Sequence, residues 1–109
     1  MTIKELQTQA HKQSVSKGFW GTIASQLGAD SSLKQKRNKG ELIALMHSEL
    51  SECLEALRHD DKENEAEELA DLLIRVGDYA EAFKINLTEA VEKKMAYNKK
   101  REYKHGKCF

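Results

Sequence analysis

Apolar residues recur every three or four positions along most of this chain, which is the period of an amphipathic helix. Thr2 followed by Glu5 has the spacing of a capping box, which predicts that a first helix begins there. Three glycines within residues 18–28 predict a break in this helix near Phe19-Trp20. Residues 30–39 are polar and basic, and we predict a loop or a short helical turn for them.

A second helix is predicted from Glu41 to Arg58, where the apolar positions form a wide stripe at helical spacing. The stripe consists of Leu42, Ile43, Leu45, Met46, Leu50, Cys53, Leu54 and Leu57. Residues 59–62 have the composition of a turn. Asn64, with Glu67 three residues later, predicts the start of a third helix, which carries apolar residues as far as Phe83.

Asn86 with Glu89 again has capping spacing, so a fourth helix is predicted from there to about Arg101. Short connections between long helices favour antiparallel neighbours, and we expect an all-α fold, an antiparallel bundle of about four to five helices. The chain is predicted to be one domain over residues 1–109: an N-terminal helix and loop (1–40), the central and last helices (41–101) and a polar tail (102–109).

Composition supports the all-α prediction and indicates a small core. The 109 residues include no proline, 33% are charged, and the hydrophobic share is 39%. That share is below the roughly 45–50% of an average globular domain. We therefore expect the core to be completed by oligomerisation.

The net charge is zero, but the charges are unevenly distributed. Eleven of the eighteen acids lie within residues 41–71, whereas residues 93–107 hold seven basic residues plus His105. An acidic centre and a basic tail suit a cation and a phosphate held together. Charged, solvated helix faces would give the same composition, and the pattern alone does not separate the two readings.

No apolar run approaches the length of a membrane span, and no signal-peptide pattern is present. The two cysteines, Cys53 and Cys108, make no disulfide framework. We therefore expect a cytoplasmic protein in a reducing compartment, without a membrane partner.

Two pairs of carboxylates are the most informative feature of the sequence. Glu49 and Glu52 are three residues apart on the second predicted helix, and Glu68 and Asp71 are three apart on the third. Each pair lies on one side of its helix, so antiparallel packing would let four carboxylates converge. Oxygen ligands favour magnesium, manganese or calcium. Glu49 falls at the edge of the apolar stripe, where an unpaired carboxylate is costly. The alternative is ordinary surface acids paired with Lys or Arg.

The spacing and residue types of these motifs resemble those of the MazG-like all-α nucleoside triphosphate pyrophosphatases. Glu-x-x-Glu, a gap of fifteen residues and Glu-x-x-Asp stand in the order typical of that family. The segments LMHSELSECLEALR and EELADLLIRVGDYA resemble its two central helices, and KMAYNKKREYKHGK resembles its C-terminal segment. The resemblance covers about residues 17–108.

This resemblance implies a Mg²⁺-dependent nucleotide pyrophosphohydrolase (Mn²⁺ is the second candidate ion) that cleaves (d)NTP to (d)NMP and pyrophosphate, in nucleotide-pool clearance. It implies that four acids are both the metal ligands and the catalytic residues, and that three residues of the last helix face the phosphates. The acids are Glu49, Glu52, Glu68 and Asp71, and the phosphate-facing residues are Lys94, Asn98 and Arg101. It also implies a homodimer or a homotetramer, with bundles built from both subunits.

Helical spacing places Lys94, Asn98 and Arg101 on one face, which suits phosphate oxygens, although a solvated helix end has the same pattern. Trp20 is a candidate for stacking on a nucleobase, against the more common role of a core or interface anchor. Asp78 shares a face with Asp71, and we expect it to be exposed or paired with Arg75 rather than at a metal.

Other function classes remain open at this point. A di-iron carboxylate bundle needs two Glu-x-x-His motifs, and this chain has one, at Glu102 and His105. In a non-enzymatic helical dimerisation or adaptor module, the acids would be solvent-exposed surface residues without a catalytic role. A nucleic-acid partner for residues 93–107 is disfavoured by the abundant acids elsewhere in the chain. We favour the enzyme.

Overall fold

The protein is all-helical over residues 1–108, the part that this computed structural model describes. The elements are α1 (Ile3–Ser16), α2 (Thr22–Leu27), α3 (Lys39–Arg58), α4 (Lys62–Ala82), α5 (Leu87–Lys99) and the 3₁₀ helix η1 (Tyr103–Gly106). The predicted fold class is therefore confirmed. The short helix α2, which was not predicted, follows the break expected near Phe19-Trp20.

Side-chain caps fix where the helices begin. Thr2 forms a complete capping box with Glu5 before α1, and Asn86 accepts a hydrogen bond from the Glu89 amide at the start of α5, both as predicted. The prediction for α4 was wrong by three residues. Its N-cap is Asp61, which accepts the hydrogen bond of the Asn64 amide, because an Asp in the preceding turn satisfies that donor before Asn64 can act as a cap.

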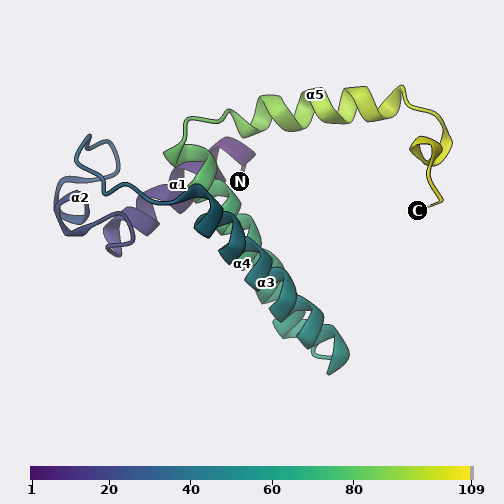
Figure 1. Cartoon of the computed structure of the whole chain (residues 1–109), viewed down its shortest axis with the longest axis horizontal. Helices are drawn as coiled ribbons and strands as arrows, with labels where there is room; N and C mark the ends of the chain where they lie inside the picture. The colour runs from purple at the N-terminus through teal and green to yellow at the C-terminus, as the bar shows by residue number, and fades with distance from the viewer. Residues whose placement is uncertain (109) are drawn as a thin grey trace.

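Helices α3 and α4 form an antiparallel pair, and α1 packs on α4 (Figure 1). Close approach of α1 and α4 depends on small side chains. A Cβ atom at Gly77 would lie 3.3 Å from the Ala10 Cβ and 3.4 Å from the Gln7 Cα. The glycine that weakens the helix in isolation therefore permits its contact with α1.

The core lies where α1, α2, α3 and α4 meet. Val15, Trp20, Ala24 and Leu42 are its buried apolar residues, and Tyr79 and Phe83 of α4 pack against them. Only 4% of Trp20 is exposed. The core is small because half of the apolar stripe of α3 is exposed, namely Ile43, Leu50, Leu54 and Leu57.

A polar cluster inside this core joins α1, Trp20 and α4. The Asp78 carboxylate accepts hydrogen bonds from His11 Nδ1 at 2.7 Å and from Trp20 Nε1 at 3.1 Å. His11 is 2% exposed. The expectation that Asp78 is exposed or paired with Arg75 was therefore wrong, since two buried ring donors face it instead. The spacing of residues along α4 cannot reveal hydrogen-bond donors that come from other parts of the chain, as His11 and Trp20 do.

Helix α5 departs from the rest of the chain and extends to one side (Figure 1). Within residues 1–108 it contacts chiefly α1, and none of its residues is buried. The radius of gyration, 16.5 Å, exceeds the roughly 13 Å of a compact domain of this length. In the described part, no helix combines the length and apolar character needed to span a bilayer.

Replacing Asp78 with Ala should destabilise the protein by about 2 kcal/mol or more, because two buried donors, His11 Nδ1 and Trp20 Nε1, lose their acceptor. Urea denaturation followed by circular dichroism would measure this change. Glu67→Ala, an exposed acid on the same helix, is the matched control and should change the free energy of unfolding little. Equal losses in both variants would contradict the role given to Asp78.

Candidate metal and nucleotide site

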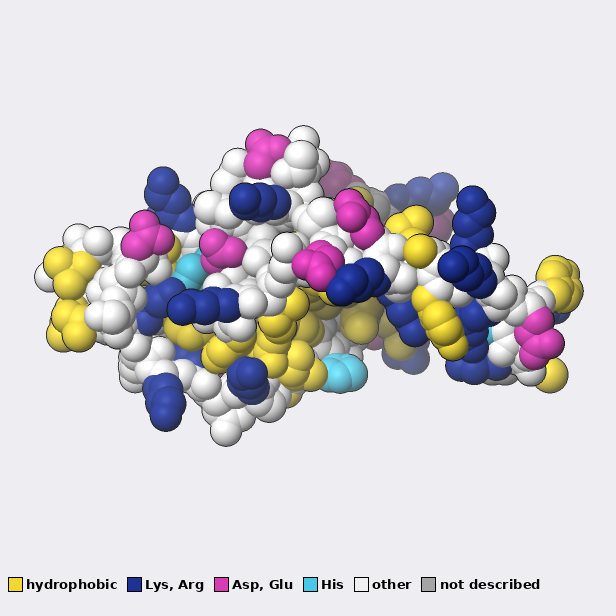
Figure 2. All heavy atoms as spheres, turned by 90° about the horizontal axis from the view of Figure 1, so that it is seen from above, with side chains coloured by type: hydrophobic (Ala, Val, Ile, Leu, Met, Phe, Trp, Pro, Cys, Tyr) yellow, Lys and Arg dark blue, Asp and Glu magenta, His cyan; other side chains and the backbone are white. Residues whose placement is uncertain are grey.

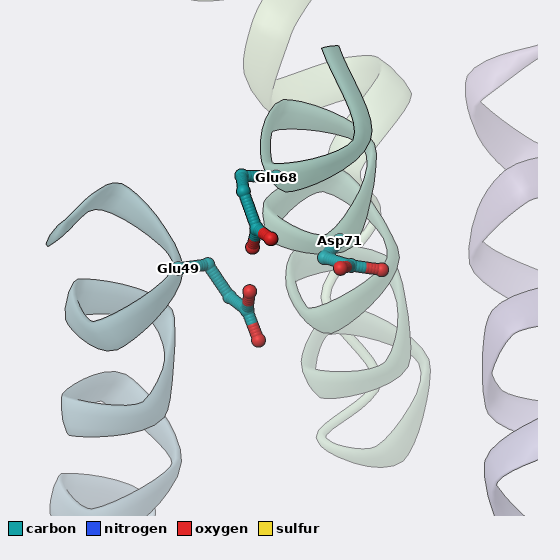
Figure 3. Close-up of side chains that lie close together, drawn as sticks. All are labelled: Glu49, Glu68 and Asp71. Atoms are coloured by element: carbon teal, nitrogen blue, oxygen red, sulfur yellow. The ribbon is translucent and has the colours of Figure 1, made fainter. Parts of the chain in front are cut away.

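Carboxylates from α3 and α4 meet at one place between the two helices. Glu49, Glu68 and Asp71 each offer a ligand oxygen, and these oxygens lie within 4.8 Å of one another. Glu49 and Glu68 point toward each other across the gap between the helices, and Asp71 lies one turn further along α4 (Figure 3). Like charges this close repel strongly, so the site requires a compensating cation or proton.

Glu49 is the buried member of the cluster, with 7% of the residue exposed, as its place at the edge of the apolar stripe predicted. Burial opposes its ionisation, but Arg75 Nε donates a hydrogen bond to its Oε1 at 2.9 Å, and the net effect lowers the pKa of Glu49. Glu49 is therefore held as a carboxylate. This role of Arg75 was not predicted. Its position four residues after Asp71, on the same helix side, was the available signal.

Glu68 behaves in the opposite way. Its carboxyl group faces those of Glu52 and Glu49, and these two neighbours, Glu52 most strongly, raise the pKa of Glu68 from 4.5 to about 7. Glu52 is exposed and does not belong to the cluster of Glu49, Glu68 and Asp71. It lies beside the cluster, where its carboxyl group contacts that of Glu68. A proton retained on Glu68 thus relieves part of the repulsion near neutral pH.

A divalent cation fits this cluster because two buried oxygens face it without a partner. Glu49 Oε2 and Glu68 Oε2 are shielded from solvent and make no hydrogen bond within residues 1–108. Buried carboxylate oxygens are costly in that state. An oxygen-only donor set of this kind suits hard ions such as Mg²⁺ or Mn²⁺.

A cavity of about 380 Å³ opens directly from the acidic cluster. Glu49 and Asp71 line one part of it, and Arg75, Arg37 and the largely exposed Phe19 line the rest. Carboxylates, guanidinium groups and an aromatic ring therefore border one space. Neither Phe19 nor Arg37 was predicted as a site residue, because the segments before and after α2 that carry them have no periodic pattern.

The structure does not bring the predicted phosphate-facing residues to the acids within one chain. Lys94, Asn98 and Arg101 lie on α5 or just beyond its end, on the arm that extends away from α3 and α4 (Figure 1). Trp20 sits in the core with the Arg37 guanidinium 5.2 Å from its ring centre. Stacking on a base would require Trp20 to leave the core.

Comparison with known proteins gives one result. The family model of the MazG nucleotide pyrophosphohydrolase domain matches residues 37–109, about two thirds of the chain. The matched range contains all four acids as well as Lys94, Asn98 and Arg101. Searches of the curated proteins and of the solved structures found no match.

Without divalent ions, the acidic cluster should destabilise the fold as the pH rises from about 4.5 to about 7. Glu68 keeps its proton longer in the folded state than in the unfolded state, because its folded pKa is raised to about 7. Raising the pH then favours the state that holds fewer protons, which is the unfolded one. Urea unfolding of wild type and Glu68→Gln in EDTA at pH 5 and pH 7.5 would measure this.

Wild type should lose more stability than Glu68→Gln between these pH values, and the exposed control Glu67→Gln should follow wild type. Parallel behaviour of wild type and Glu68→Gln would contradict the raised pKa.

Proposed function

The chain belongs to the MazG nucleotide pyrophosphohydrolase family, a metal-dependent, all-α family that acts on nucleoside triphosphates, and from this we propose that it hydrolyses (d)NTP to (d)NMP and pyrophosphate with Mg²⁺. The observation that carries the proposal is the cluster of Glu49, Glu68 and Asp71 beside a cavity lined by arginines. We place this activity in the cytoplasm, in the clearance of nucleotides from the cellular pool.

We assign the metal to the three clustered acids, with Glu52 as the fourth ligand. Glu49 is already ionised through Arg75, and its Oε2 is free to bind. Glu68 would release the proton that it holds near neutral pH. Metal affinity in this proposal therefore rises with pH through about 7, because each bound ion must displace that proton.

In the proposed reaction a water adds to the α-phosphorus, the bond from that phosphorus to the bridging oxygen breaks, and pyrophosphate leaves. A bound divalent ion supplies neutralisation of the phosphate oxygens and a lower pKa for the attacking water. One of the four carboxylates accepts the proton of the water. Arg75 and Arg37 line the adjoining cavity, where they would hold phosphate oxygens, and Phe19 offers a ring for the base.

We propose further that a second copy of the chain completes the site. Met95 on α5 is 67% exposed, and Leu50, Leu54, Leu57, Leu69 and Leu73 of the α3–α4 pair are also exposed. On the arm formed by α5 and the tail, basic side chains gather around hydrophobic ones (Figure 2). Asn98 Oδ1 is shielded from solvent and has no hydrogen-bond partner in the described part of the chain. In a dimer, or in a tetramer of two dimers, Lys94, Asn98 and Arg101 would reach the acids of the partner.

Glu49→Gln should reduce pyrophosphate release by about 100-fold or more, because an amide cannot replace an ionised metal ligand. The assay incubates the protein with Mg²⁺ and a panel of nucleoside triphosphates and detects pyrophosphate. Glu55→Gln, an exposed acid on the same helix, should keep wild-type activity. Both variants should retain the helical circular dichroism. Wild-type activity in Glu49→Gln would remove the proposed role of the cluster.

Mixing two inactive variants tests whether the site is shared between copies. Glu49→Gln and the double variant Lys94→Ala/Arg101→Ala are unfolded and refolded together. If the acids of one copy act with the cations of the other, each mixed dimer has one intact site and one inactive site. Random pairing of equal amounts makes half of the dimers mixed, so about a quarter of the wild-type activity should return. No recovery, although native mass spectrometry shows mixed oligomers, would contradict the shared site.

A further inference from the structure

A second and larger cavity, of about 910 Å³, lies against a different face of α1. Its walls are α1, residues 27–34, the end of α4 and the start of α5. We name it the lysine groove, after Lys4, Lys12, Lys34 and Lys84, which line it. It shares no lining residue with the cavity beside the acidic cluster.

The lysine groove carries an excess of positive charge. Its two acids are Asp30 and Glu81, against the four lysines. Among residues 1–108, none of these lysines forms an ion pair within 4.0 Å. Glu81 is already engaged, because its Oε1 accepts a hydrogen bond from Gln7 Nε2 at 2.9 Å. The ammonium groups are therefore available to an anion.

Lys34 is held at the floor of the groove by the buried polar cluster of the core. Its Nζ lies 3.0 Å from His11 Nε2. With the proton of His11 on Nδ1 and donated to Asp78, Nε2 is an acceptor for Lys34. An ammonium group has three donors. One is used for His11, and two remain for a ligand.

Another wall of the groove is held by Gln7, which is buried. Its Nε2 also donates to the Ile85 carbonyl oxygen at 2.7 Å, and its Oε1 accepts a hydrogen bond from the Leu87 amide. These contacts tie the link between α4 and α5, including Lys84, to α1. The backbone of this wall is thus positioned before any ligand binds, which lowers the entropic cost of binding.

We propose that the lysine groove binds a small phosphate-bearing anion, at a site separate from the proposed hydrolytic one. Lysines recognise phosphate as point charges, and the hydroxyl-bearing residues Thr8 and Thr88 line the same space. The cavity volume falls in the range of sites for small metabolites. The acidic cluster would repel such an anion when no metal is present, so the two sites are separable by experiment.

The test is a ¹H–¹⁵N NMR titration of the whole chain in EDTA at constant ionic strength, with sodium pyrophosphate and, separately, ribose 5-phosphate as probes. We expect saturable shift changes at Lys12, Lys34 and Lys84 and at the His11 ring nitrogens, since Lys34 bonds that ring. Ribose 5-phosphate that binds at least as tightly as the more highly charged pyrophosphate would identify the ligand as an organic ester, whereas saturable binding of pyrophosphate alone would identify it as inorganic.

Lys12→Ala/Lys84→Ala should raise the dissociation constant about tenfold or more, because two ammonium contacts are lost. The control Lys62→Ala/Lys99→Ala removes the same charge from exposed positions outside the groove and should change it by less than about twofold. Lys34→Gln keeps a donor for His11 and should weaken binding while the fold persists. Shifts that do not saturate, or equal weakening by the two double variants, would overturn the proposal.

Discussion

Repulsion among carboxylates at the contact of α3 and α4 is the constraint on which the candidate site depends. One oxygen from each of three of these groups lies within 4.8 Å of the others, and Glu49, the buried member, is shielded from the screening of water. Two features of the chain reduce this repulsion. Arg75 neutralises Glu49, while Glu68 retains a proton with a pKa of about 7. Both devices leave an oxygen without a partner, which is the arrangement expected where a cation takes the remaining bonds.

Helix α1 packs beside the contact of α3 and α4 and borders the cavities on either side of itself. It packs on α4 through Ala10 and Gly77, and the ring donors of His11 and Trp20 converge on Asp78. One face of α1 borders the cavity that opens from the acids, and another borders the lysine groove. The hydrogen bond between His11 and Asp78 spans the two, since His11 lines the groove and Asp78 lines the other cavity. A single buried contact therefore joins the two places where we infer ligands.

A single copy leaves much apolar and basic surface without a partner. Leu57 is 59% exposed, and α5 buries none of its residues. Large exposed apolar surfaces usually mark an interaction site. A second copy that covered these leucines and brought α5 to the acids would explain both features together. It would also explain why the acidic and the basic residues of the region that matches the family model lie apart in one chain.

The sequence by itself determined the all-α class, the capping of α1 and α5 and the placing of Glu49 with Glu52, and of Glu68 with Asp71, on one side of a helix. These features follow from helical periodicity and from hydrogen bonds within four residues, which are local. It misplaced the start of α4 and missed α2, since competing caps and short helices differ by small local energies. Only the tertiary structure decided that Asp78 faces His11 and Trp20, that Arg75 holds Glu49, and that α5 lies away from the acids. These outcomes depend on which helix faces meet, and that is set by packing between residues far apart in the chain.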